Sequence, residues 1–218
     1  VQIAWDGIDA AKMWDSHAHL VGMGDGSTGA WVNPQMESVW HTRQYIQRLF
    51  YLNAGCTHEA KQRVDQAYIE RTHNLLDGMR PGANLLLLAV DYHHNGSGEA
   101  IKEKSAFYLP NDYAAKIAKQ HPQYFEWAAS IHPYRKDCVE ALRRAVQNGA
   151  RAVKWLPAAQ GMNPASPLCD KFFEAMAQYQ LPLITHAGEE KAVHGGDTQA
   201  FGNPLLLRRA LDHGVRVA

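Results

Sequence analysis

Short apolar runs alternate with longer amphipathic stretches along the whole chain. The runs predict strands at residues 13–19, 84–91, 125–131, 150–156, 181–185 and 215–218. Helical spacing and capping residues predict helices at 37–52, 58–78, 113–120, 136–148, 167–179 and 203–213. The first helix is expected over the mouth of the fold, and Asn111 and Asp112 are expected to cap the third. Strands that alternate with helices at intervals of about 25–35 residues are typical of βα units and a parallel sheet.

The first run is weak, but the later expected strands are apolar almost throughout, as in a parallel sheet that is buried on both faces. Two features favour a barrel over a doubly wound sheet. No GxGxxG turn follows the first strand, and polar residues follow nearly every strand rather than one switch point. We therefore expect an α/β fold, a (β/α)8 TIM-like barrel. Because such a barrel has eight strands, residues 1–218 are expected to supply about the first six, as a single domain truncated at its C-terminal end.

Composition and charge narrow the range of partners. Lys and Arg total 22, as do Asp and Glu, so the formal net charge is zero and no nucleic-acid partner is expected. No apolar run approaches the roughly 18 residues of a membrane span, so no membrane contact is expected. The cysteines at 56, 138 and 169 form no CxxC pair, which is typical of a reducing compartment. We expect a cytoplasmic protein with a small-molecule substrate, while a homodimer and a targeting segment upstream of Val1 stay open.

Histidines gather where the expected strands end. Six of the twelve lie at or just after the C-terminal end of a strand, namely His17, His19, His93, His94, His132 and His186. Barrel enzymes build their sites on that face, and imidazole is the commonest ligand of zinc and its neighbours. His17 and His19 are two residues apart, so on extended chain both rings point to the same side. An isolated HxH is more often a solvated turn, but this one ends a strand and follows Asp15. The sequence therefore predicts a metal site built from His17, His19 and His186.

Lys154 places a charge inside an apolar strand, and burying an unpaired ammonium is costly. Three explanations stay open. The first is a carboxylated lysine that bridges two metals. The second is an unmodified lysine paired with a substrate carboxylate or a nearby Asp. The third is a side chain that reaches solvent at the strand end. His132 and Arg135 follow the third strand and are expected to bind substrate, with a structural turn as the equal alternative.

Four further side chains lie beside expected strand ends. Either His93 or His94 is a candidate for the substrate pocket, with structural roles for both as the alternative. Glu189 and Glu190 follow His186 and are expected in a solvated loop, with support of the metal ligand or acid chemistry as the alternative. His194 is expected in a loop.

From Trp14 onward the sequence resembles the amidohydrolase superfamily, within the branch of acyl-group hydrolases and aminocarboxymuconate-type decarboxylases. The resemblance rests on the order and spacing of three segments, residues 15–19 (DSHAH), 150–157 (ARAVKWLP) and 185–188 (THAG). It implies a (β/α)8 barrel with metal ligands after the first and fifth strands. It also implies a further His after the sixth strand and an Asp after the eighth, both beyond Ala218.

The resemblance assigns roles by position. His17, His19 and His186 match the metal ligands, and Lys154 matches the strand-four lysine that is carboxylated in binuclear members. The expected function is a metal-dependent hydrolase of an acyl C–N or C–O bond, with one or two divalent ions per chain, Zn²⁺ being the first choice. Lys154, His132 or Arg135 would orient an anionic group of the substrate. The alternatives are a metal-dependent decarboxylase of an aromatic or unsaturated acid, and a non-catalytic, metal-stabilised binding or scaffold protein.

Overall fold

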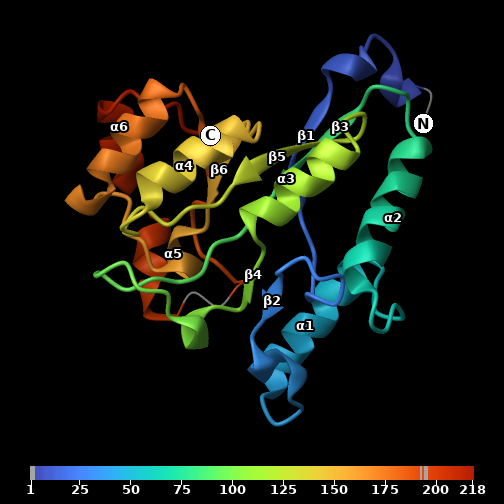
Figure 1. Cartoon of the computed structure of the whole chain (residues 1–218), viewed down its shortest axis with the longest axis horizontal. Coiled ribbons are helices and arrows are strands. Elements are labelled where there is room, and N and C mark those ends of the chain that lie inside the picture. The colour runs from blue at the N-terminus through green and yellow to red at the C-terminus, as the bar shows by residue number, and fades with distance from the viewer. Residues whose placement is uncertain (1–2, 192, 194–195) are drawn as a thin grey trace.

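A computed structural model describes the chain except for residues 1–2, 192 and 194–195, so His194 lies outside the described residues. Its main sheet has five strands, β1 (Trp14–His19), β3 (Asn84–Leu88), β5 (Phe125–Ala129), β6 (Ala152–Trp155) and β7 (Leu183–Thr185). All neighbouring strands are parallel, and their order in the sheet is their order in the chain (Figure 1). A doubly wound sheet reverses its strand order at a switch point, whereas a barrel does not. The predicted barrel architecture is confirmed as five parallel strands of a partial barrel.

The sixth expected strand is present only as a bridge. Val217 pairs in parallel with Leu183 on β7. The Leu183 N–H donates to the Arg216 carbonyl at 2.8 Å, and the Ala218 N–H donates back to the Leu183 carbonyl at 2.9 Å. Residues 215–218 therefore lie beside β7, as predicted, but they form too short a pairing to count as a strand.

The helices lie near their expected positions. They are α1 (Thr42–Ala54), α2 (Val64–Asp77), α3 (Asn111–Gln120), α4 (Cys138–Gln147), α5 (Pro157–Gln160), α6 (Asp170–Gln178) and α7 (Arg208–Asp212). The expected helix at 37–52 is divided, because a short 3₁₀ helix (Pro34–Glu37) precedes α1 and a turn separates the two. Helix α5 and a small antiparallel pair, β2 (Trp31–Val32) with β4 (Phe107–Tyr108), were not predicted.

The predicted cap of α3 was wrong. Asn111 is the first residue of that helix, and Pro110 precedes it as the capping residue. The Asn111 side chain instead brackets the backbone of Ser130, donating to its carbonyl at 3.0 Å and accepting from its N–H at 2.8 Å. Asn111 therefore ties α3 to the segment that follows β5.

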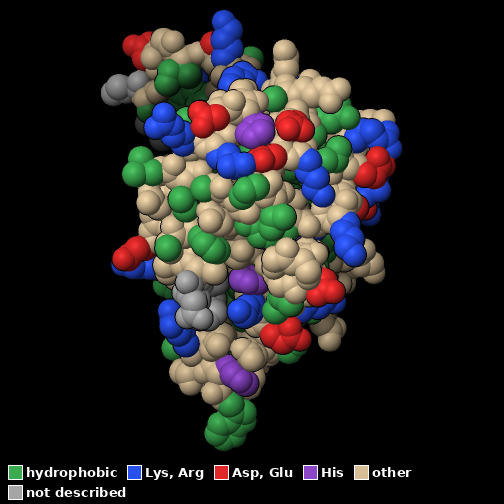
Figure 2. Space-filling model, turned by 90° about the vertical axis from the view of Figure 1, so that its left-hand side faces the viewer, with side chains coloured by type: hydrophobic (Ala, Val, Ile, Leu, Met, Phe, Trp, Pro, Cys, Tyr) green, Lys and Arg blue, Asp and Glu red, His purple; other side chains and the backbone are tan. Residues whose placement is uncertain are grey.

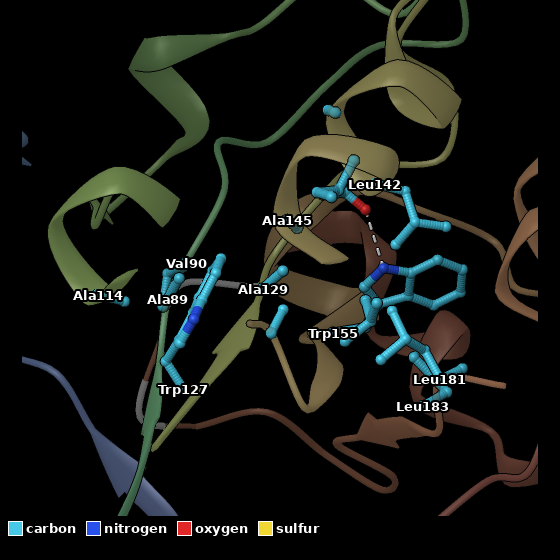
Figure 3. Packing of buried hydrophobic residues seen from close by; sticks show 14 of the residues in the cluster. Ala89, Val90, Ala114, Trp127, Ala129, Leu142, Ala145, Trp155, Leu181 and Leu183 are labelled. Atoms are coloured by element: carbon cyan, nitrogen blue, oxygen red, sulfur yellow. Dashed lines mark hydrogen bonds between the residues drawn. The ribbon is translucent and has the colours of Figure 1, made fainter. Parts of the chain in front are cut away.

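Alternate residues of the strands pack on the two faces of the sheet. Leu87, Trp127, Val153 and Trp155 belong to a large core that α2, α3, α4 and α6 complete. Figure 3 shows Trp127 on the side of Ala114 from α3, and Trp155 between Leu142 and Leu183. The opposite face, called the inner face below, carries a smaller cluster made of Leu86, Leu88, Ala128 and Ala152. Both clusters are buried, so apolar packing stabilises the sheet on both faces.

Surface properties agree with the composition. On the face that Figure 2 shows, basic and acidic side chains are interleaved rather than gathered into a patch of one sign. Among the described residues, no helix combines the length and apolarity needed to cross a bilayer. All three cysteines are free, with Cys138 and Cys169 buried and Cys56 exposed.

Candidate metal and substrate site

Lys154 lies on the inner face of the sheet, two residues along β6 from Ala152. It is 2% exposed, so the expectation of a buried charge inside a strand is met and escape to solvent is not observed. Burial lowers the pKa of its ammonium group, and the Glu190 carboxylate opposes that shift. The described residues provide no hydrogen bond to its Nζ. Lys154 does not itself line the cavity described below, so its charge acts on the histidines from behind the cavity wall.

His17 and His19 project from β1 to the same side, as their spacing predicts. Their Nε2 atoms lie 3.0 Å apart, and their ring centroids lie 4.9 Å apart. Two nitrogens at this separation match two ligands of one ion, because metal–imidazole bonds measure about 2.0–2.1 Å. The Tyr68 hydroxyl of α2 donates to the His19 carbonyl, and the Asp15 carboxylate accepts from the His17 N–H at 2.9 Å. The end of β1 is thus held through its backbone, while the two rings contact one another through their Nε2 atoms.

The electrostatic surroundings keep this pair neutral. Desolvation, followed by electrostatic interaction with His17 and Lys154, lowers the pKa of His19 to about 4. Desolvation and the Lys154 charge also lower the pKa of His17, while Asp15 opposes the shift. Neutral imidazole is the form that binds a metal ion. The positive charge of Lys154 on β6 thus disfavours a proton on either ring at the end of β1.

His186 follows β7 and lines the same cavity as His17 and His19, but its ring contacts its own loop. Its Nε2 lies 3.3 Å from the Glu189 carbonyl, and its Nδ1 lies 3.7 Å from Glu190 Oε2. Within the described part of the chain, no three His, Cys, Asp or Glu side chains are arranged to hold a metal ion. The structure therefore assembles two of the three predicted ligands and places the third on the same wall.

A cavity of about 610 Å³ opens beside these histidines. The loop after β1, the Pro34–Glu37 turn, α1 and β4 supply most of its wall, which is largely apolar. Arg48 of α1 is the one Lys or Arg side chain among the described residues that line it. Its Nε donates to the Met36 carbonyl at 2.9 Å, and its guanidinium lies over the Tyr45 ring at 5.6 Å. Sequence reasoning missed Arg48, because an arginine on an amphipathic helix gives no signal of a site.

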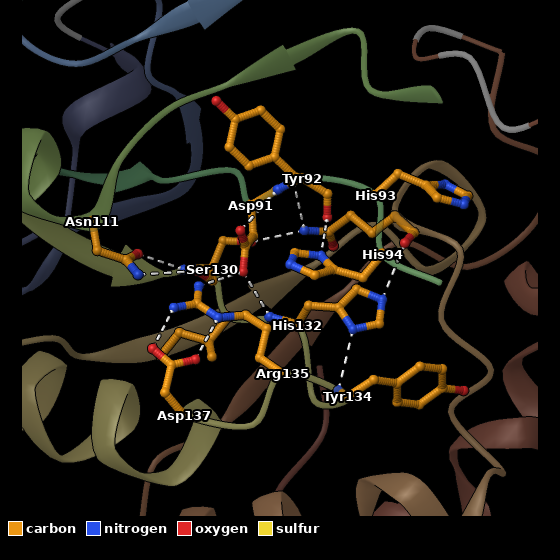
Figure 4. A network of polar contacts seen from close by, with 12 residues as sticks. Asp91, Tyr92, His93, His94, Asn111, Ser130, His132, Tyr134, Arg135 and Asp137 are labelled. Atoms are coloured by element: carbon orange, nitrogen blue, oxygen red, sulfur yellow. Dashed lines mark hydrogen bonds and ion pairs between the residues drawn. The ribbon is translucent and has the colours of Figure 1, made fainter. Parts of the chain in front are cut away.

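His132 and Arg135 lie in a separate network around the buried Asp91 carboxylate (Figure 4). Asp91 Oδ2 accepts from the His132 backbone N–H and from Arg135 Nη1, each at 2.9 Å. Arg135 also binds Asp137 through two hydrogen bonds of 2.9 and 2.8 Å. Neither His132 nor Arg135 lines the cavity, so the structure does not bring these two residues to the histidine pair. Their expected part in substrate binding stays a prediction.

The rings of His132, His93 and His94 form hydrogen bonds in the same region. His132 Nδ1 accepts from the Tyr134 N–H at 3.2 Å, so its Nε2 carries the proton toward the Gln160 carbonyl, 3.1 Å away. Burial keeps the pKa of His132 well below its ordinary value. His94 Nδ1 lies 2.9 Å from the Tyr92 carbonyl and His93 Nδ1 lies 3.1 Å from the Ala159 carbonyl, and neither side chain lines the cavity. These contacts join the segments that follow β3, β5 and β6.

Comparison with known proteins agrees with this arrangement. The family model described as amidohydrolase matches residues 14–214, which is nearly the whole chain. The chain belongs to the amidohydrolase family. No curated protein is similar enough to this amidohydrolase-family chain to count as a match.

Solved structures support the fold of the amidohydrolase-family chain. An uncharacterized TIM-barrel protein, Bb4693 from Bordetella bronchiseptica, is 16% identical with a TM-score of 0.56, over 94% of this chain and 65% of that one. An amidohydrolase II is 19% identical with a TM-score of 0.48, over 68% of this chain and 54% of that one. A 2,6-dihydroxybenzoate decarboxylase is 12% identical with a TM-score of 0.41, over 93% and 61%. The last two scores are too low to bear on the fold. The chain spans about half to two thirds of the length of these structures.

Proposed function

We propose that this chain carries out metal-dependent hydrolysis of an acyl C–N or C–O bond in a small molecule. One observation carries the proposal: two neutral imidazoles, His17 and His19, lie 3.0 Å apart on the wall of a 610 Å³ cavity in an amidohydrolase-family chain. A divalent metal ion bound there, Zn²⁺ in our proposal, supplies a Lewis acid and an acidified water. The location that we propose is the cytoplasm.

His17 and His19 would hold the ion through their facing Nε2 atoms. His186 would join them only by giving up its contacts with Glu189 and Glu190, because its ring nitrogens face those residues. Glu190 would then be the carboxylate on the cavity wall that accepts a proton from the acidified water. It is 6% exposed, and its Oε1 accepts from the Val193 N–H at 2.9 Å, which fixes the direction of the group.

Lys154 has two candidate roles, and the number of metal ions bound per chain distinguishes them. The lowered pKa of its ammonium favours the neutral amine, which can add to CO₂ with loss of one proton to give a carbamate. A carbamate would bridge two metal ions, and the count would then be two per chain. An unmodified lysine would instead bind an anionic group of the substrate, and the count would be one. We propose one metal ion and the substrate role, since the facing Nε2 atoms of His17 and His19 provide two ligands for one ion, and no three His, Cys, Asp or Glu side chains among the described residues are arranged to hold a metal ion.

Arg48 is our choice for orienting the substrate. A guanidinium binds a carboxylate through two parallel hydrogen bonds, and Arg48 meets the cavity from an apolar wall where such bonds are strong. His132 and Arg135 were expected in this role, but both are engaged around Asp91.

The same guanidinium favours a second candidate function, decarboxylation of an aromatic or unsaturated acid. An apolar cavity suits the planar body of such an acid, and Arg48 matches its carboxylate. A third candidate, a metal-stabilised binding protein without turnover, predicts metal binding with no product in any assay.

The test is reconstitution of the metal-free protein with Zn²⁺ or Mn²⁺, followed by elemental analysis and two assays. One assay follows hydrolysis of N-acyl and ester compounds, and the other follows CO₂ release from aromatic acids. Activity and metal content should both be lost in His17→Ala. The matched control is His58→Ala, which removes an exposed histidine that does not line the cavity and should change neither. Full metal content in His17→Ala would refute the proposal.

A further inference from the structure

Among the described residues outside the site, Asp65, in the first turn of α2, is the carboxylate that accepts the most hydrogen bonds. It is 2% exposed. Its Oδ1 accepts from the N–H groups of Met23 and Gly24 at 2.5 and 3.2 Å. Its Oδ2 accepts from the Gly26 N–H at 3.3 Å and from the Thr28 hydroxyl at 2.5 Å. Four donors from one glycine-rich loop therefore surround a single buried carboxylate.

The loop and the helix hold one another. Asp25, at the centre of the loop, accepts from the N–H groups of Val64 and Asp65 at 2.6 and 3.1 Å, so it caps the N-terminus of α2. A Cβ placed on Gly22 or Gly26 would lie 3.2 Å from side-chain atoms of Asp65. Glycine at these two positions lets the backbone approach the carboxylate closely.

This loop continues directly from the histidine pair into the cavity wall. Gly22 and Met23, three and four residues after His19, both line the cavity. One turn along α2 from Asp65, Tyr68 donates its hydroxyl hydrogen to the His19 carbonyl and lines the cavity as well. Helix α2 therefore holds the chain at two points, at the end of β1 and in the loop that follows.

We propose that Asp65 is a positioning residue for the metal site. Its carboxylate locks residues 22–28 onto α2, and the locked loop fixes the end of β1, where His17 and His19 face one another. The inference rests on the proposed function, because it assigns Asp65 to the support of that ligand pair. The carboxylate is specific for this role, since an asparagine amide presents one oxygen and one NH₂ group, and the NH₂ group would face N–H and O–H donors.

The test compares Asp65→Asn with Asp77→Asn. Asp77 is the last residue of the same helix, accepts a hydrogen bond from the Tyr124 hydroxyl, and does not line the cavity. The probe is Co²⁺ added to metal-free protein, followed by its visible absorption. Asp65→Asn should weaken Co²⁺ binding by about tenfold or more and change the spectrum, whereas Asp77→Asn should stay within about twofold of the wild type. Co²⁺ binding by Asp65→Asn that equals the wild type would overturn the inference.

Hydrogen–deuterium exchange of the metal-free protein tests the positioning role without any metal. Exchange in Asp65→Asn should rise across residues 17–28, including the histidine pair, and should not rise there in Asp77→Asn. A rise confined to residues 22–28 would also overturn the inference. If Asp65→Asn does not fold, Thr28→Val removes one of the four donors and should give the same changes at smaller size. Failure of the wild type to bind Co²⁺ would refute the proposed function, while the exchange result still decides on Asp65.

Discussion

Replacing Lys154 with methionine should make the metal-free protein more stable. Lys154 is 2% exposed, it lies on the inner face like the apolar Ala152 of the same strand, and the described residues give its ammonium no hydrogen bond. Methionine keeps an unbranched side chain of similar length without the charge. Removing the cost of burying that charge should raise the free energy of unfolding by about 1–3 kcal/mol at neutral pH.

The pH dependence of this gain has a fixed sign. Burial lowers the pKa of Lys154 in the folded state below the value of about 10.5 that it has in the unfolded chain. Between these two values the unfolded state binds the extra proton, so the wild type gains stability as pH rises. The advantage of Lys154→Met should therefore be full below the folded-state pKa and shrink as pH approaches 10.5. Each unit by which burial lowers the pKa corresponds to about 1.36 kcal/mol, so the two measurements check one another.

The assay is urea unfolding of metal-free protein at several pH values, in buffer free of bicarbonate so that no carbamate forms. Lys116→Met is the matched control, because Lys116 is an exposed lysine on α3 and its replacement should change stability by less than about 0.5 kcal/mol. Lower stability of Lys154→Met at neutral pH, or a gain that does not shrink at alkaline pH, would refute the reasoning.

Three further predictions concern the cavity and the Asp91 network. Arg48→Met should raise KM for an anionic substrate by about tenfold or more. Arg43→Met replaces an exposed arginine on the same helix and should not raise KM. Equal KM values for the two variants would show that Arg48 does not bind the substrate. Asp91→Ala should cost about 1–3 kcal/mol in urea unfolding, because it leaves the buried His132 N–H without its partner and removes the buried carboxylate of the two that bind Arg135. Asp137→Ala, which removes the more exposed partner of Arg135, should cost less than about 1 kcal/mol, and equal losses would contradict the assignment. Burial holds the pKa of His132 below its unfolded value of about 6.5, so the free energy of unfolding should fall as pH drops through that value. When urea midpoints are plotted against pH between about 8 and 5, His132→Gln should give a smaller slope than the wild type.

The order of the sheet was predictable because most of its strands are apolar runs that are separated by helical stretches. The alternation that places Leu87 outward and Leu88 inward is hidden within a continuous apolar run, yet the run itself marks the strand. The short pair β2 and β4 was missed, because two-residue strands leave no period in the sequence. Lys154, in contrast, gives a clear signal in the sequence, because a single lysine in an apolar strand is costly to bury and so indicates a role for its charge.

The site was predictable only in part. The facing rings of His17 and His19 follow from two-residue spacing on a strand. The ring direction of His186 does not, because it depends on whether the ring turns toward Glu189 and Glu190 or toward the cavity. The positions of His132 and Arg135 after a strand were read correctly, but the buried Asp91 that engages them comes from the segment after another strand, and one sequence does not show that pairing.

The cavity wall and the segments that follow the central strands are held by different contacts. Most of the apolar wall comes from a single stretch of chain, residues 20–57, which anchors to α2 through one buried carboxylate and its loop. The segments after β3, β5 and β6 are joined to one another by the Asp91 network instead. A change of substrate is therefore best sought by substituting wall residues within that stretch, with the pairing of β2 and β4, the lysine and the Asp91 network kept intact.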